Sequence, residues 1–253
     1  FAMPDVEIIT GIEYPKNRIQ AFGCSLTAFH NWRYLAKNND HTKFRYQRES
    51  HNMKIRSGDI GRVHWKKDDI HLTDYSIAGW GNDIQHIQYA NEVYNNRISK
   101  DDIILWQLSS TNRIATENEI SASANGDIRV ENIFSGEEFN LNFDISSSHS
   151  NTLYNSYSTY STLWQLNGVK RNNDKLLVIF GWDFLGPKEK KETINFLKEH
   201  EIDYIEESIL NWTRERNFVN KDKTDVLHPP QEGYKAFTEY VVIPKLNKLK
   251  WLD

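Results

Sequence analysis

The chain has 253 residues, a formal net charge of -4 at pH 7, a mean hydropathy of -0.69 and one cysteine. Its length suits one sizeable α/β domain, and the absence of a basic run excludes nucleic acid as a partner, because phosphate binding needs clustered Lys and Arg. No apolar run approaches the roughly 20 residues of a membrane span, and a single cysteine rules out an internal disulfide. No signal peptide is visible at the amino end, so we expect a soluble protein and favour the cytoplasm.

Aromatic residues make up 13% of the chain, with eight Trp and twelve Tyr. Such residues are typical of contact surfaces, where a large apolar body and a polar tip are both useful. Together with the weak net charge, this composition favours a sugar or another neutral polar ligand.

The first predicted strand, Ile19–Phe22, runs into a tight turn at Gly23, and helical periodicity follows over Leu26–Asn38. Ser25 lies in this turn, at the carboxyl edge of the predicted sheet, where open α/β sheets bind ligands. A serine placed there can attack a carbonyl when a base reaches it. The alternative is an ordinary helix N-cap, for which serine is a preferred residue.

Residues 39–68 are polar and predict a loop with room for one short element. A second strand is predicted over Ile70–Ala78 and a helix over Asn82–Arg97. Between them, Gly79 allows a backbone N–H to approach a substrate oxygen closely, as an acyl-transfer transition state requires. The stretch can also be a plain helix start, capped by Asn82 or Asp83.

The clearest strand is Asp101–Leu108, whose nearly continuous apolar run is typical of a strand covered on both faces. The polar residues after it include Asn112, whose side-chain amide would add a donor for an oxyanion, and Arg113, which would bind an anionic group or a carboxylate of the protein. The alternative is a polar loop without a chemical role.

Residues 117–150 interrupt the alternation of strands and helices. They contain two turn signals, Asn125-Gly126 and Ser135-Gly136, and short alternating stretches at Ile128–Val130 and Phe139–Phe143. We expect an inserted β-hairpin or lid-like segment rather than a separate domain.

The remainder returns to the alternation. The predicted elements are a helix over Thr152–Val169, a strand over Asp174–Gly181, a helix over Pro187–Lys198, a strand over Ile202–Ile205, a loop over 211–230, and a last helix over Gln231–Lys248 that Pro244 kinks or shortens. Five strands alternating with helices predict a parallel sheet covered on both faces, within one domain spanning residues 1–253.

Asp225 and His228 precede the last predicted helix, in a loop that ends in two prolines. An aspartate three residues before a histidine can orient the imidazole, which can then act as general base toward a serine. The alternative is a surface loop in which Asp225 only caps a turn. Other histidines, such as His64, His71 and His86, lack the spacing of metal ligands and are interpreted as surface residues.

These segments resemble the conserved blocks of the SGNH (GDSL-type) hydrolase superfamily. Gly23–Thr27 resembles the first block, Ser76–Asn82 the second and Asp225–Pro229 the last, Asp-x-x-His-Pro. The resemblance implies a three-layer flavodoxin-like fold, with Ser25 as nucleophile and the N–H of Gly79 in an oxyanion hole.

The chain departs from the family pattern at two places. Cys24 replaces the usual aspartate of Gly-Asp-Ser, and the third block, usually Gly-x-Asn-Asp, reads Ser109-Ser-Thr-Asn112-Arg. Asn112 or Thr111 then corresponds to the family's oxyanion asparagine, while Gly81-Asn82-Asp83 resembles part of that motif after a different strand. Similar Gly-Cys-Ser starts occur in SGNH relatives associated with polysaccharide modification.

The function predicted from the residues and the resemblance is hydrolysis of a small acyl ester, with an acetyl ester of a carbohydrate as the expected substrate. Ser25, His228 and Asp225 would form the triad, while Ser25 N–H, Gly79 N–H and Asn112 would receive the oxyanion. No metal or organic cofactor is required. The alternatives are a sugar O-acyltransferase with the same triad and a carbohydrate-binding protein without catalysis.

Overall fold

The computed structural model describes residues 17–24, 63–67, 70–76, 81–109, 113–115, 120–125, 127–132, 138–141, 148–181, 187–219 and 228–252. Its central sheet is formed by β1 (Asn17–Phe22), β2 (Val63–Lys67), β3 (Ile70–Asp74), β4 (Ile103–Leu108), β9 (Leu176–Phe180) and β10 (Asp203–Ile205). The predicted helix over Leu26–Asn38 lies outside the described residues.

Five strands of this sheet are parallel, in the spatial order β3-β1-β4-β9-β10. Numbered along the chain as parallel strands, that order is 2-1-3-4-5, the flavodoxin-like arrangement. The predicted fold class is therefore confirmed. The sheet has one further strand, β2, which pairs antiparallel with β3 at the edge and falls within the stretch that was predicted as a loop with one short element.

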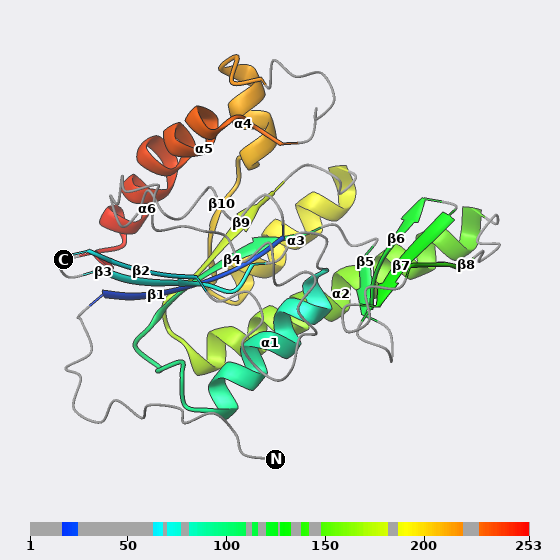
Figure 1. Ribbon diagram of the computed structural model, residues 1–253, viewed down its shortest axis with the longest axis horizontal. Helices are drawn as coiled ribbons and strands as arrows, with labels where there is room; N and C mark the ends of the chain where they lie inside the picture. Colours follow the sequence, from blue (N-terminus) through cyan, green and yellow to red (C-terminus); the bar gives the residue numbers. More distant parts are fainter. Residues whose placement is uncertain are drawn as a thin grey trace.

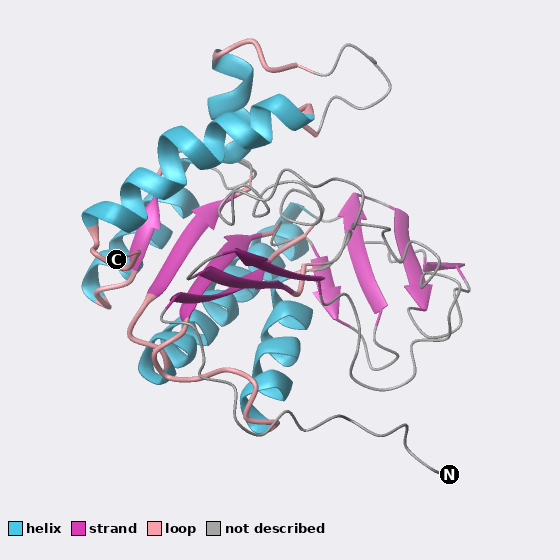
Figure 2. Ribbon diagram, turned by 60° about the vertical axis from the view of Figure 1, so that its left-hand side comes forward, coloured by secondary structure: helices cyan, strands magenta, loops and turns pink. Residues whose placement is uncertain are grey.

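Helices cover both faces of the sheet, giving three layers (Figures 1 and 2). One face packs against α1 (Asn82–Tyr94), α2 (Ser148–Asn172) and α3 (Pro187–Glu199). The other packs against α4 (Ile209–Glu215), α5 (Gln231–Phe237), the π-helical η3 (Thr238–Val242) and α6 (Ile243–Lys248).

The two faces divide the side chains of β4 between two cores. Ile103 and Leu105 lie in the core beneath α4–α6, whereas Ile104, Trp106 and Leu108 lie in the core beneath α1–α3. Because every residue of this strand is buried, the sequence reads as an apolar run rather than an alternation. β9 was predicted for the same reason, because it too is buried at every residue and reads as an apolar run.

Two helix predictions need correction. The predicted loop over 211–230 begins inside α4, which Ser208 caps by accepting a hydrogen bond from the Asn211 N–H at 3.3 Å. The last predicted helix is helical throughout, but its middle is η3. Pro244 lacks an N–H, so it leaves a carbonyl of the preceding turn without its usual partner, and such positions favour irregular turns.

The inserted segment is larger than the predicted hairpin. It forms a four-stranded antiparallel sheet of β5 (Arg113–Ala115), β6 (Ile120–Asn125), β7 (Asp127–Asn132) and β8 (Glu138–Leu141), in sequence order. β7 and β8 correspond to the two predicted strands, whereas β5 and β6 were not predicted. Figure 1 shows this sheet apart from the central one, with β5 against α1. A lid-like role and the single domain both stay predictions.

Buried polar groups join β1 and β4 near the beginning of β4. The Asp102 carboxylate accepts hydrogen bonds from the Gln20 amide at 2.9 Å and the Ser99 N–H at 3.0 Å, and lies 3.2 Å from the Arg18 guanidinium. Burial raises the pKa of Asp102, and the hydrogen bond from the Ser99 N–H and the charge of Arg18 partly oppose this rise.

Among the described residues, no helix combines the length and the apolar character that a membrane span requires.

Candidate active site at the carboxyl edge of the sheet

The carboxyl ends of β1 and β4 lie side by side at the point where the order of the parallel strands changes direction. β1 pairs with β4 in a register that sets Phe22 opposite Trp106. Ligands of open α/β sheets bind outside such a topological switch point. The residue after the described end of the β1 segment is Ser25, and the chain beyond β4 leads to Asn112, so two of the predicted blocks leave the sheet from these neighbouring strands.

The end of β1 is fixed by a residue that the sequence analysis did not single out. The Gln107 Oε1 atom accepts hydrogen bonds from the Cys24 N–H at 3.1 Å and from the Cys24 thiol at 3.2 Å. Both residues are fully buried. Sequence reasoning missed this contact because a lone glutamine within an apolar strand carries no motif, although a polar side chain at a fully buried position always needs a partner.

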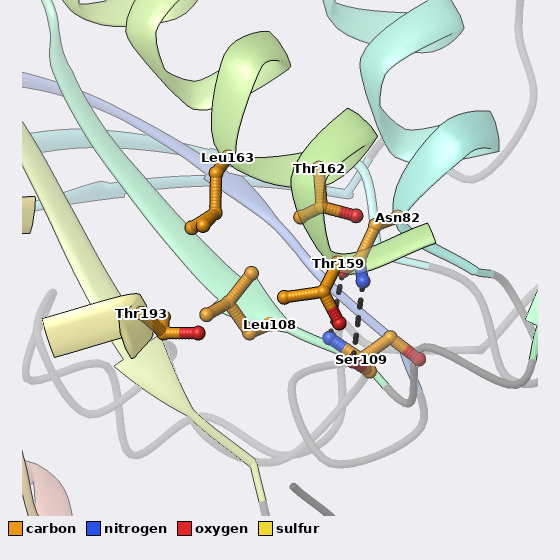
Figure 3. Close-up of a pocket in the computed structure, with 7 residues that line it drawn as sticks. All are labelled: Asn82, Leu108, Ser109, Thr159, Thr162, Leu163 and Thr193. Carbon is orange, nitrogen blue, oxygen red and sulfur yellow. Dashed lines mark hydrogen bonds between the residues drawn. The ribbon is translucent and has the colours of Figure 1, made fainter. Parts of the chain in front are cut away.

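The end of β4 is tied to the beginning of α1 (Figure 3). Asn82 Nδ2 donates to the Ser109 carbonyl at 3.2 Å, and the Ser109 N–H donates to Asn82 Oδ1 at 2.8 Å. The cap of α1 is Gly81, without a side-chain bond, so the prediction of Asn82 or Asp83 as the cap is wrong. The Asn82 amide instead holds the backbone from which the third block begins.

A small cavity lies beside this pair, between β4 and helices α1–α3 (Figure 3). The hydroxyls of Thr162 and Thr193 are buried there and have no hydrogen-bond partner among the described residues. Its lining residues are Asn82, Leu108, Ser109, Thr159, Thr162, Leu163 and Thr193. The carboxyl end of β4 therefore has polar side chains on its α1–α3 side as well as apolar ones.

The end of β3 is held against β1. The Tyr75 N–H donates to the Ala21 carbonyl at 2.8 Å, and the Ser76 N–H donates to Asp74 Oδ1 at 2.8 Å. Tyr75 also stacks on Phe22, with ring centroids 4.9 Å apart. These contacts fix the chain up to three residues before Gly79, on the side of β1 away from β4.

His228 is the one predicted triad residue that the structure describes. It is half-buried and precedes the buried Pro229 and the N-cap residue Pro230 of α5. In Figure 1, α5 begins on the side of the sheet toward which the parallel strands point. Ser25, Gly79, Asn112 and Asp225 lie outside the described residues, so their predicted roles stay predictions.

The segments that carry Ser25 and His228 approach the same core. Cys24, at the end of β1, belongs to the buried cluster that also contains Tyr234, Ala236 and Phe237 of α5. Residues some 200 positions apart in the chain thus pack on one face of the sheet. Cys24 of the first block and the helix that follows the last block therefore share one core on this face.

Gly233, in α5, lies where a side chain would collide with Phe218 and with Pro229, the residue after His228. A Cβ atom at this position would lie 2.9 Å from Phe218 Cβ and 3.2 Å from Pro229 Cβ. Replacing a helical glycine by alanine normally stabilises by about 0.5–1 kcal/mol. Here we expect Gly233→Ala to destabilise the fold by about 1–3 kcal/mol, because these backbone-near atoms have to move.

Denaturant unfolding measures this change, and Gly168→Ala in α2 is the matched control. A Cβ atom at Gly168 meets nothing within 4 Å, so alanine there should show the ordinary helix gain of about 0.5–1 kcal/mol. Equal stabilisation by both substitutions would contradict the tight packing of α5 on Pro229.

His86 corrects the interpretation of the other histidines as surface residues. It is half-buried on α1, with its ring centroid 6.3 Å from that of Tyr89 and 6.5 Å from that of Trp106. Burial lowers the pKa of His86, and the neighbouring Asp83 carboxylate partly opposes this effect. His64 and His71 lie in β2 and β3, and their side chains are outside the description. Within the described part of the chain, no group of three His, Cys, Asp or Glu side chains is arranged to hold a metal ion.

Comparison with solved structures finds proteins that are similar to this chain at low sequence identity. A lipase/acylhydrolase from Enterococcus faecalis is 10% identical, with 92% of this chain and 96% of that chain covered and a TM-score of 0.49. TesA is 10% identical, with 92% of this chain and 99% of the TesA chain covered and a TM-score of 0.49. A member of the lipolytic G-D-S-L family from Veillonella parvula is 14% identical, with 89% of this chain and 98% of that chain covered and a TM-score of 0.41.

No protein-family model and no curated protein matches the sequence. The chain resembles the SGNH hydrolases in its sequence blocks, and it has the flavodoxin-like strand order that this resemblance implies.

Proposed function

We propose that this protein is a serine hydrolase that cleaves a small acyl ester, an acetyl ester of a carbohydrate, through Ser25, His228 and Asp225. The observation that carries the proposal is the packing of Cys24 in one core with Tyr234 and Ala236 of α5. It supports a meeting of the serine that follows Cys24 with the histidine that precedes α5.

The proposed chemistry is acyl transfer through a covalent intermediate. Ser25 Oγ attacks the ester carbonyl while His228 takes its proton, and Asp225 holds the imidazole in the required tautomer. The negative charge that forms on the carbonyl oxygen is received by the N–H groups of Ser25 and Gly79 and by the Asn112 amide.

The tetrahedral intermediate then breaks the ester bond, and His228 returns the proton to the departing alcohol. Water, deprotonated by His228, releases the acid and restores Ser25. Cys24, directly before the proposed nucleophile, lies beside the switch point between β1 and β4, and this supports the assignment, since substrates of such sheets bind outside the strand ends. The aromatic-rich composition supports a carbohydrate as the alcohol portion.

A fluorophosphonate probe tests the proposal directly, because it reacts covalently with activated serines. We expect labelling of the folded protein at Ser25, located by peptide mass analysis, together with hydrolysis of a small acetyl ester. A folded protein that takes no label and hydrolyses no ester would contradict catalysis and favour a carbohydrate-binding role. Formation of acylated sugar from an activated acyl donor and a free sugar, faster than acid release, would identify a transferase instead.

A further inference from the structure

The side chain of Gln107 joins the carboxyl ends of neighbouring strands at the switch point. It is fully buried, on the face of β4 where Ile103 and Leu105 precede it. An aliphatic residue would continue that pattern, so the choice of an amide at this single position requires a reason other than packing.

The contacts of Gln107 fix the orientation of its amide group. A backbone N–H can only donate, so the atom that faces the Cys24 N–H must be the carbonyl oxygen, Oε1. The Cys24 thiol donates to the same oxygen, so both of its lone pairs are used. Nε2 therefore points the other way and donates to the Leu108 carbonyl.

The Leu108 carbonyl connects this arrangement to a third strand, because it also accepts the Gly181 N–H at 3.4 Å. One amide side chain is thus hydrogen-bonded directly to the ends of β1 and β4, and through Leu108 to the end of β9. We call Gln107, Cys24 and Leu108 the strand-end clamp.

We propose that Gln107 is a positioning residue that holds the turn carrying the nucleophile, an inference that rests on the function proposed above. Cys24 immediately precedes Ser25, and Leu108 immediately precedes the segment that leads to Asn112. The clamp therefore sets the spacing between the proposed nucleophile and the segment that leads to Asn112, one of the proposed oxyanion donors. Gln107 itself is fully buried, so among the described residues it acts through these neighbours.

Replacement of Gln107 by methionine tests the proposal, because it keeps an unbranched side chain of similar size and removes the amide. We expect kcat for a small acetyl ester to fall about 10- to 100-fold, since a displacement of roughly 1 Å at reacting groups has that effect. KM should change by less than about threefold, because an interaction that acts mainly in the transition state affects kcat.

Gln20→Met is the matched control. Gln20 is an equally buried glutamine on β1, but its amide bonds Asp102 near the opposite end of β4. Both variants lose one buried amide and should lose similar stability, whereas only Gln107→Met should lose kcat. Equal kcat in Gln107→Met and the parent protein, with the parent active, would overturn the proposal.

A second measurement does not depend on catalysis. Cys24 is the single cysteine of the chain, so the rate at which the native protein reacts with an aromatic disulfide reagent reports the opening of the clamp alone. We expect this rate to rise about tenfold or more in Gln107→Met, because fewer contacts resist local opening, and to be unchanged in Gln20→Met.

The two measurements separate the possible failures. An unchanged thiol reaction rate in Gln107→Met would overturn the clamp whatever the activity. A parent protein that hydrolyses no ester, combined with faster thiol reaction in the variant, would overturn the proposed function while supporting the clamp as a structural device.

Discussion

Ser25→Ala is expected to reduce turnover of a small acetyl ester by a factor on the order of 10⁴ or more, because the acyl-enzyme cannot form without the hydroxyl. The fold should be retained, since removal of one hydroxyl oxygen changes little volume. Steady-state hydrolysis measures the turnover, and the urea midpoint of the same preparation measures whether the fold is retained.

Ser161→Ala is the control for this substitution. Ser161 is a half-buried serine on α2 whose hydroxyl contacts Gln165 of the same helix at 3.5 Å. This variant should retain the turnover of the parent protein and its reaction with fluorophosphonate. Unreduced hydrolysis in Ser25→Ala would remove this residue from the mechanism and leave the serine of the turn as a helix cap.

His228→Ala is expected to have an effect of similar size, about 10³- to 10⁴-fold on kcat, because the serine then lacks its base. The position before Pro229 and Pro230 supports a fixed imidazole, since the N-cap residue Pro230 has φ -65 and its carbonyl accepts the Gly233 N–H at 2.9 Å. The measurement is kcat with the same acetyl ester, in buffer where the parent protein is fully active.

His200→Ala is the matched control for the histidine. His200 is half-buried beyond α3, where its ring lies 4.1 Å from that of Phe196. Its loss should affect stability slightly and turnover not at all. The double variant Ser25→Ala/His228→Ala should be no slower than the Ser25 variant alone, because residues of one triad act as a unit. Additive losses would contradict that coupling.

The central sheet was predictable because burial on both faces leaves a direct record in the sequence. β9 reads as an uninterrupted apolar run, and β4 as a run interrupted only by Gln107. Long helices such as α2 were found with boundaries a few residues short, since frayed ends carry weak signals. The alternation of these elements then restricted the chain to a parallel sheet with helices on both faces.

Short elements, and hydrogen bonds between residues far apart in the sequence, were not predictable. α4 has seven residues, fewer than two full turns, so its apolar residues show no period. β6 is rich in Ser and Ala, which are poor markers of strands. The hydrogen bonds of Asn82 and Gln107 join residues 27 and 83 positions apart, and such pairs become visible only when the strand order is known.

The wide turn of η3 determines which face of the final helical segment is buried. Tyr234, Thr238, Val242 and Leu246 are all buried, and they recur every four residues. On an α-helix of 3.6 residues per turn, three such steps would rotate the side chains by roughly 120° away from the sheet. The extra residue per turn of η3 counteracts that drift, so a one-residue deletion within Thr238–Val242 would turn α6, and Leu246 with it, by about 100° toward solvent.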